Sequence, residues 1–220
     1  MPIDPIYIRH LAHAGYGGST FFVTKCVEGA FEERTLKKER GHVKRLKDYF
    51  LYLSRPESNA SKSEVISAYT AYKTERRRLM ALQDQVLDTA SFSPVMLARP
   101  AVSDIIFRTL SEEQGNSIWT HAICLMSNHY HWVFDLFQTD QNGKALRLPK
   151  FLQKVHSKWA IEINRLDGAK GRKVWQDEAY DVTIRDQRQM DNAINYTLNN
   201  PVKAGLCKSI DEYEFTLRFQ

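Results

Sequence analysis

Residues 126–134 read Met-Ser-Asn-His-Tyr-His-Trp-Val-Phe, and this stretch decides which sheet the chain is predicted to build. The turn Met126-Ser127-Asn128 separates two predicted strands, over residues 117–126 and 129–137. Two neighbouring strands that are joined by so short a turn pair in the antiparallel direction. The stretch therefore predicts a β-hairpin at the centre of an antiparallel sheet.

Two imidazoles lie two residues apart in the second of these strands. Successive side chains of a strand point to opposite faces, so His129 and His131 project together while Tyr130 projects the other way. Two neutral imidazoles can share one metal ion, and together with amide, carboxylate or water ligands they accept Mg²⁺ or Mn²⁺. A His-x-His pair alone is more often a packed or surface pair, so a metal site needs support from other residues.

A second informative stretch is residues 196–205, Tyr-Thr-Leu-Asn-Asn-Pro-Val-Lys-Ala-Gly, at the end of a predicted helix. Asp186 is suited to cap the N-terminus of this helix, because its carboxylate can accept from the free backbone N–H groups of the first turn. Pro201 is expected to end the helix at about residue 199, because proline has no N–H to donate.

Two rows of side chains run along this helix. Met190, Ile194 and Leu198 follow one another at i, i+4 and i+8, and this apolar row is expected to face the core. At 100° per residue, Tyr196 lies about 200° from Ile194 and is expected to point away from the apolar row. A second row with the same spacing consists of Asn192, Tyr196 and Asn200.

The remaining pattern alternates helices and strands without regular βαβ repeats, which favours an α+β fold: a central antiparallel sheet flanked by helices. Residues 33–90 have helical periodicity on both sides of a polar loop at 56–62, and they predict a helical hairpin with Ser61 and Glu64 as a capping box. The other predicted elements are strands over 19–27 and 180–184 and helices over 102–113 and 148–164.

The composition is that of a globular protein with a sizeable core, since 43% of its residues are hydrophobic. Lys and Arg exceed Asp and Glu by 31 to 26, an excess that permits nucleic acid as a partner but does not show it. No signal peptide and no membrane-spanning stretch are predicted. The widely spaced Cys26, Cys124 and Cys207 favour a reducing compartment, and a cytoplasmic location is expected.

These segments together resemble the single-tyrosine transposases of the HUH endonuclease superfamily, and within it the REP-associated tyrosine transposases. The family's His-hydrophobic-His strand after a Met-x-Asn turn is similar to residues 126–131. Its Trp-Gln…Tyr…Ile-Arg-Asp segment is similar to residues 175–186, and its Tyr-x-x-x-Asn-Pro-Val-x-Ala-Gly ending matches residues 196–205 without a gap. The resemblance implies a ferredoxin-like HUH core within a single domain, 1–220.

The resemblance covers residues 16–27 and 115–207. It does not cover the helical hairpin at about 33–90, which is an insertion relative to the family's usual core. Tyr130 is also bulkier and more polar than the residue that most commonly separates the two histidines. The resemblance implies a monomer, whereas the apolar seam of the insertion allows a dimer as the alternative.

The resemblance also implies a mechanism and a partner. Tyr196 would attack a phosphodiester of a single-stranded DNA hairpin and form a 5′-phosphotyrosine, so that the chain could cut and rejoin strands. His129, His131 and Asn200 would hold a divalent metal, Mg²⁺ or Mn²⁺. The predicted DNA contacts are a basic row on the helix over 148–164 and the basic loop after it: Lys150, Lys154, Lys158, Lys170, Arg172, Lys173 and Trp175.

Three other interpretations remain open at this point. The chain could be a domesticated relative that binds hairpin DNA without cutting it. It could be a metallohydrolase in which a metal-bound water, and not Tyr196, attacks the phosphodiester. It could also be a non-catalytic domain in which His129 and His131 pack structurally. The presence of all four predicted site residues favours the transposase-like enzyme.

Overall fold

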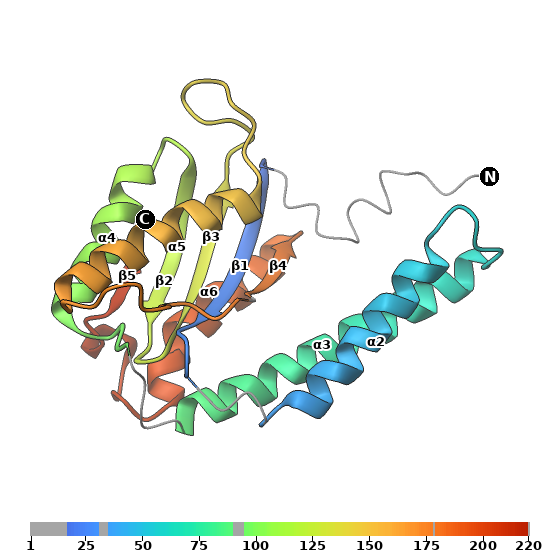
Figure 1. Cartoon of the computed structure of the whole chain (residues 1–220), viewed down its shortest axis with the longest axis horizontal. Coiled ribbons are helices and arrows are strands. Elements are labelled where there is room, and N and C mark those ends of the chain that lie inside the picture. Colours follow the sequence, from blue (N-terminus) through green and yellow to red (C-terminus); the bar gives the residue numbers. More distant parts are fainter. Residues whose placement is uncertain (1–16, 31–34, 90–94, 178, 220) are drawn as a thin grey trace. The chain divides into compact units, whose positions relative to one another are not determined.

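The computed structural model describes residues 17–30, 35–89, 95–177 and 179–219 (Figure 1). The chain divides into two compact units. One, the hairpin unit, comprises residues 31–89 together with 1–14, and the other, the sheet unit, comprises 15–30 and 90–220. Among the helices of the described ranges, none combines the length and the apolar character that a bilayer crossing requires.

The sheet unit contains a five-stranded sheet in the order β4-β1-β3-β2-β5, and every pair of neighbours is antiparallel. Helices α4 and α5 connect its strands in the sequence β1-α4-β2-β3-α5-β4, which is the ferredoxin-like arrangement. The predicted α+β class is therefore confirmed. The strands are β1 Ser19–Cys26, β2 Ile118–Leu125, β3 His129–Leu136, β4 Tyr180–Ile184 and β5 Thr216–Arg218.

The side chains of strand β3 alternate between an apolar face and a polar face of the sheet. Helices α4 (Pro100–Glu113) and α5 (Leu148–Leu166) lie on one face, and α6 (Gln187–Lys203) lies on the other (Figure 1). Trp132 stacks on Phe134 at 3.9 Å between ring centroids, within the apolar core under α5. The histidines occupy the alternate positions of the same strand and face α6, as the alternation predicts.

Helix α6 begins as predicted but ends later. The carboxylate of Asp186 accepts a hydrogen bond from the backbone N–H of Gln189 at 2.8 Å, which confirms the predicted cap. The prediction that Pro201 ends the helix is wrong, because the helix continues through Pro201 to Lys203. Proline removes one hydrogen bond at this position, and the bonds of the surrounding last turn hold the helix together without it.

The actual end of α6 is a Schellman motif. The backbone N–H of Leu206 donates to the carbonyl of Pro201 at 2.9 Å, and that of Gly205 donates to the carbonyl of Val202 at 3.0 Å. Gly205 has a φ of 73°, a left-handed conformation that favours glycine. The glycine that closes the motif therefore sets the end of the helix.

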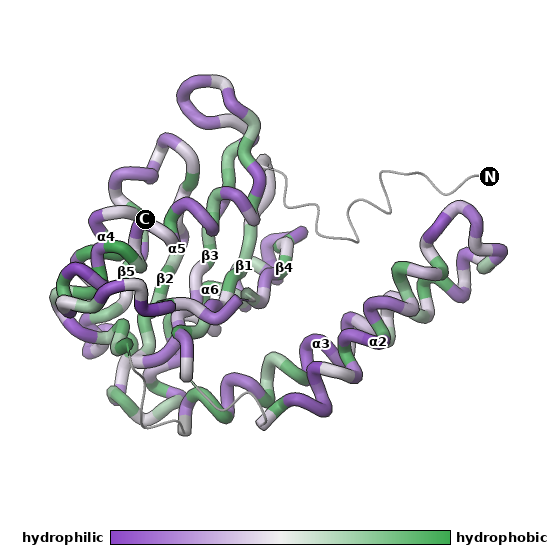
Figure 2. Tube along the Cα trace, viewed as in Figure 1, coloured by the Kyte–Doolittle hydropathy of each residue, from purple (hydrophilic) through white to green (hydrophobic). Residues whose placement is uncertain are grey.

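The hairpin unit consists of α2 (Lys37–Leu53) and α3 (Lys62–Thr89), as predicted for this segment. Phe50 of α2 packs against Tyr69 and Tyr72 of α3, with ring centroids 5.3 and 6.4 Å apart. The capping box is confirmed, since the backbone N–H of Ser61 donates to Glu64 at 2.8 Å and that of Glu64 donates to the Ser61 hydroxyl at 3.3 Å. Both helices carry many hydrophilic positions (Figure 2).

A buried polar pair lies inside the apolar face of the sheet unit. The Tyr130 hydroxyl and Nε2 of His156 are 2.5 Å apart, and the indole N–H of Trp175 donates to the backbone carbonyl of His156 at 3.0 Å. Burial, together with the positive charge of Lys25, lowers the pKa of His156 to about 3. The imidazole is therefore neutral, and its Nε2 can accept a hydrogen bond from the Tyr130 hydroxyl.

The depressed pKa of His156 predicts a pH-dependent stability. As the pH falls below about 6.5, the unfolded chain takes up a proton that the folded chain refuses until about pH 3, so stability is lost across this window. Between pH 7 and pH 5 we expect His156 to contribute a loss of about 2 kcal/mol. Urea unfolding at both pH values, compared with His156→Gln, measures it: an equal loss in the variant would contradict the assignment.

Candidate active site on the histidine face of the sheet

The two histidines of β3 converge on one point. Nε2 of His129 and Nε2 of His131 lie 3.1 Å apart, and the two rings are nearly perpendicular. The other ring nitrogen of each histidine has its own partner. Nδ1 of His129 lies 2.7 Å from the amide oxygen of Asn128, and Nδ1 of His131 lies 2.8 Å from the hydroxyl of Thr24.

The outer partners constrain the tautomers of the pair. The amide oxygen of Asn128 can only accept, so Nδ1 of His129 carries the proton and Nε2 carries a lone pair. The hydroxyl of Thr24 can accept from or donate to Nδ1 of His131. When it donates, Nε2 of His131 carries a proton and can donate to Nε2 of His129 at 3.1 Å; when it accepts, both Nε2 lone pairs are available to one cation.

The electrostatic surroundings keep both imidazoles neutral. Burial, and then the charge of Lys203, lower the pKa of His129 to about 3. Burial, followed by the charges of His129 and Lys203, holds the pKa of His131 well below its ordinary value. Neutral imidazole is the form that binds metals, so the pair is ready to ligate throughout the neutral pH range.

Tyr196 of α6 packs directly on this pair. Its ring lies edge-on to His131, with centroids 5.2 Å apart, and edge-on to Phe22 of β1 at 5.7 Å. Phe22 in turn stacks on His131 at 5.8 Å. The sequence predicted that Tyr196 points away from the apolar row of its helix. The structure turns the tyrosine toward the sheet, whereas Asn192, one turn earlier in the same row, is exposed.

Asn200 follows Tyr196 by one helical turn and is buried, with 1% of its surface exposed. Within the described residues, neither its amide oxygen nor its amide nitrogen has a hydrogen-bond partner. A buried amide without partners costs free energy, and such an orphan commonly marks a place where an ion or ligand completes the contacts. Two neutral imidazoles and an amide oxygen are a donor set that suits a divalent metal, so these residues fit one.

Lys203 completes the polar row of α6 at its C-terminal end. Its ammonium lies 5.9 Å from the centroid of the Tyr196 ring, and its charge acts on both histidines. The sequence interpretation assigned no role to Lys203, nor to Thr24 and Asn128. A cation one turn beyond Asn200 and a polar residue before the first histidine are signals that the sequence did contain.

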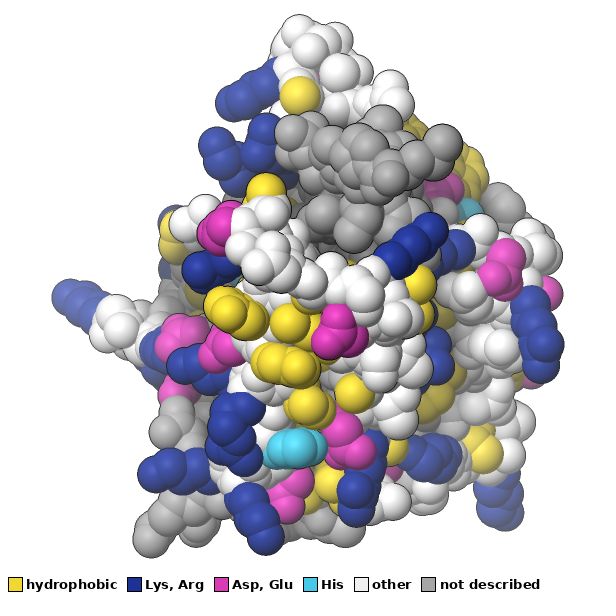
Figure 3. Space-filling model, turned by 90° about the vertical axis from the view of Figure 1, so that its right-hand side faces the viewer, with side chains coloured by type: hydrophobic (Ala, Val, Ile, Leu, Met, Phe, Trp, Pro, Cys, Tyr) yellow, Lys and Arg dark blue, Asp and Glu magenta, His cyan; other side chains and the backbone are white. Residues whose placement is uncertain are grey.

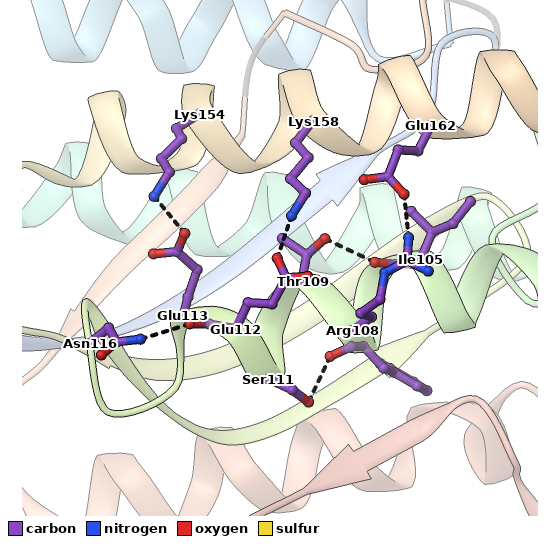
Figure 4. Close-up of polar contacts among 11 residues, drawn as sticks. Ile105, Arg108, Thr109, Ser111, Glu112, Glu113, Asn116, Lys154, Lys158 and Glu162 are labelled. Carbon is purple, nitrogen blue, oxygen red and sulfur yellow. Dashed lines mark hydrogen bonds and ion pairs between the residues drawn. The ribbon is translucent and has the colours of Figure 1, made fainter.

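The basic row of α5 lies on the other face of the sheet. Lys154 pairs with Glu113 at 2.5 Å, and Lys158 pairs with Glu112, both across to α4 (Figure 4). Arg108 of α4 reaches back to Glu162 in the same way. The structure therefore does not bring this row together with the histidines and Tyr196. Lys150, at its start, is exposed.

The basic loop after α5 is also engaged with acidic neighbours. Arg172 pairs with Asp167 at 2.5 Å, and Lys173 bridges Glu28 at 3.1 Å and Asp177. Lys170 is exposed. The structure buries Trp175 beside the Tyr130–His156 pair, with 8% of its surface exposed, so its indole is a core side chain here.

Comparisons with known proteins find a similarity in sequence and a similarity in structure. No protein-family model matches the chain. A curated protein of Haemophilus influenzae (strain ATCC 51907 / DSM 11121 / KW20 / Rd), named "Putative REP-associated tyrosine transposase", is 24% identical over 101 residues. The match covers 44% of this chain, and the chain spans 57% of that relative's length.

A solved structure is also similar. It is described as the REP-associated tyrosine transposase bound to a REP hairpin, and it aligns with 91% of this chain and 76% of its own at 13% identity and a TM-score of 0.44. In sequence, the chain resembles a REP-associated tyrosine transposase.

The orphaned amide of Asn200 gives a test that needs no substrate. Replacing Asn200 with Leu, which has nearly the same shape, removes two buried unpaired polar atoms, so we expect the free energy of unfolding to rise by about 1–3 kcal/mol in a chelating buffer. Asn199→Leu is the matched control, because Asn199 is exposed and its amide already donates to the carbonyl of Asn195 at 2.8 Å. No gain for Asn200→Leu over Asn199→Leu would show that the amide is satisfied.

Proposed function

We propose that this protein is a metal-dependent, single-stranded DNA endonuclease and strand transferase that acts at DNA hairpins through a covalent 5′-phosphotyrosine. One observation carries the proposal. A tyrosine ring packs on a pair of neutral histidines whose Nε2 atoms lie 3.1 Å apart, and a buried, unpaired amide lies one turn along the tyrosine's helix. The sequence similarity to a REP-associated tyrosine transposase supports the same class. Because the chain spans only part of that relative, the activity of the whole protein is part of the proposal.

His129, His131 and Asn200 would hold the metal. A divalent metal bound there supplies charge that polarises the scissile phosphate and stabilises the negative charge that develops on it. Mg²⁺ and Mn²⁺ are the ions that we propose. Thr24 and Asn128 fix the histidine rings through their Nδ1 atoms, so the ligand geometry is set before the ion arrives.

Tyr196 would supply the nucleophile. Its hydroxyl oxygen forms a bond to phosphorus while the bond to the 3′ oxygen breaks, so the products are a 5′-phosphotyrosine and a free 3′-OH. The phenol proton leaves to solvent, and the 3′ oxygen takes up a proton in return. Tyrosine has a pKa of about 10, so the hydroxyl is a weak nucleophile that needs a nearby positive charge. The phosphotyrosine bond retains the energy of the broken phosphodiester, which allows later rejoining.

The proposed DNA-contacting side chains differ in how accessible they are. Lys150 and Lys170 are exposed, whereas Lys154, Lys158, Arg172 and Lys173 would have to exchange acidic partners for phosphates. Stacking by Trp175 would require its indole to leave the core. We propose that the protein acts on DNA as a monomer.

The second candidate is a hairpin-binding protein that no longer cuts. The Asn200 amide argues against it, since a protein that only binds DNA gains nothing from a buried amide without partners. A third candidate, a metallohydrolase, would use the same histidines but would not need Tyr196.

Replacing Tyr196 with Phe tests the nucleophile. Phenylalanine keeps the ring contacts with Phe22 and His131 and removes only the hydroxyl. With labelled single-stranded hairpins from the flanks of the encoding gene and Mg²⁺ or Mn²⁺, we expect a denaturant-resistant protein–DNA adduct from the wild type and none from Tyr196→Phe. The measurement is a denaturing gel.

The possible outcomes separate the candidates. Cleavage that persists in Tyr196→Phe would support the metallohydrolase. Hairpin binding by the wild type without any adduct, in either metal, would support the non-cutting protein.

Direct metal binding tests the ligands without DNA. We expect Mn²⁺ to bind the wild type in a calorimetric titration, and we expect His129→Ala to weaken that binding by at least about tenfold, because one of three protein ligands is lost. His121→Ala is the matched control, since His121 lies on the same sheet but pairs with Asp135 at 3.0 Å. Equal effects of the two substitutions would mean that the metal binds elsewhere.

A further inference from the structure

The positive charge of the chain is concentrated in the hairpin unit. Residues 1–14 and 31–89 hold 14 Lys and Arg against 10 Asp and Glu, an excess of four. The whole chain has an excess of five, 31 against 26, so the sheet unit holds 17 against 16, an excess of one. On the face that Figure 3 draws, basic side chains are spread among acidic and apolar ones. The attraction of a polyanion therefore depends on the hairpin unit more than on the sheet unit.

One side of α2 combines cations with exposed aromatic rings. We call this side the α2 stripe; it consists of Lys38, His42, Arg45, Tyr49 and Tyr52, all exposed. At 100° per residue these five residues fall within an arc of about 80° around the helix. Phe50, which packs on α3, lies about 80° beyond one edge of that arc, and Asp48 lies about 40° beyond the other edge. Tyr49 and Tyr52 are 55% and 58% exposed, unusually open for such large rings.

Ordinary packing within the hairpin unit does not account for the α2 stripe. Phe50 already fills the contact with Tyr69 and Tyr72 on the other side of the helix. Within the described ranges, no acidic side chain forms an ion pair with Lys38 or Arg45. Cations that alternate with accessible aromatic rings are the pattern by which proteins hold single-stranded nucleic acid, through phosphate contacts and base stacking.

We propose that the α2 stripe binds the single-stranded DNA on which the proposed enzyme acts, so that the inserted helices carry a DNA contact of their own. The proposal rests on the proposed function for the identity of the DNA. Lys38 and Arg45 contact backbone phosphates, and Tyr49 and Tyr52 stack on unpaired bases. From Lys38 to Tyr52 the helix rises about 21 Å, enough to follow several nucleotides.

The test is a comparison of two double substitutions in the full-length chain with Tyr196→Phe, so that no cutting occurs. Lys38→Gln/Arg45→Gln removes two charges from the α2 stripe. Lys37→Gln/Lys44→Gln is the matched control, because it removes two exposed charges from the same helix, about 100° away from the stripe. The probe is a fluorescein-labelled oligothymidylate of roughly 30 nucleotides, followed by anisotropy over a range of salt concentrations.

If the α2 stripe contacts phosphates, the stripe variant loses affinity and its salt slope falls by about 1.4, that is, about 0.7 for each lost contact. The control variant keeps a slope close to that of the parent. Equal slopes for the two variants would mean that the hairpin unit attracts DNA only through its overall charge, and the proposal would be overturned. Thermal melts of each variant confirm that the helices remain folded.

The tyrosines give an independent measurement. Tyr49→Ala/Tyr52→Ala is expected to weaken oligothymidylate binding by about tenfold, whereas Tyr49→Phe/Tyr52→Phe retains the stacking rings and the affinity. Unchanged binding by the alanine variant, with a change from dimer to monomer in sedimentation, would identify the α2 stripe as a contact between two copies and contradict the proposal.

These results are distinguishable from those on the catalytic proposal. Adduct formation by the protein carrying Tyr196, with no effect of either stripe variant on DNA binding, would overturn this inference alone. Loss of binding in the stripe variant supports the inference even if no hairpin yields an adduct, because the readout requires neither metal nor cleavage.

Discussion

The structure depends on the alternation of side chains along β3. One strand supplies Tyr130, Trp132 and Phe134 to the apolar core and His129 and His131 to the candidate active site, and neighbouring positions cannot exchange roles. A shift of one residue in the pairing with β1 would bury the imidazoles under α5 and turn the large aromatic rings toward α6. Because the core would lose its largest side chains, packing of the apolar face also fixes the position of the histidines.

The polar face is built at a cost to the stability of the metal-free protein. Within the described residues, the amide of Asn200 lies buried without hydrogen-bond partners. Such an amide opposes folding on its own and becomes favourable when a ligand pairs with it. The Tyr130–His156 pair on the other face is different, because its donor and acceptor satisfy each other. The contrast separates a polar pair that stabilises the core from a polar group that is kept for binding.

Local patterns in the sequence predicted most elements, and the misses have physical reasons. The turn at 126–128, the cap at Asp186 and the capping box at Ser61 and Glu64 each depend on neighbouring residues, and all three are confirmed. The end of α6 was wrong because the Schellman motif at Gly205 holds the last turn despite the missing N–H. Strand β5 was not predicted, because a strand of three residues shows too little periodicity to be recognised in the sequence.

The sequence predicted some features of the candidate site and missed others, for a related reason. The histidine pair follows from strand alternation alone, whereas the direction of Tyr196 depends on how α6 rolls on the sheet, which helical spacing does not determine. The acidic partners of Lys154 and Lys158 come from α4, 41 and 46 residues earlier, and local sequence patterns do not predict such distant pairs.

The position of β1 has a consequence for how the protein is made. β1 is a central strand, yet its partner β3 follows it at a distance of 107 residues, as the Thr24–His131 pair shows. Ribosomes add about 5–20 residues per second, so β1 waits roughly 5–20 s for its neighbour to be synthesised. The helices of the insertion, whose contacts are local, can form during that interval. The growing chain therefore carries an unpaired, apolar strand for several seconds, and such transient exposure promotes aggregation.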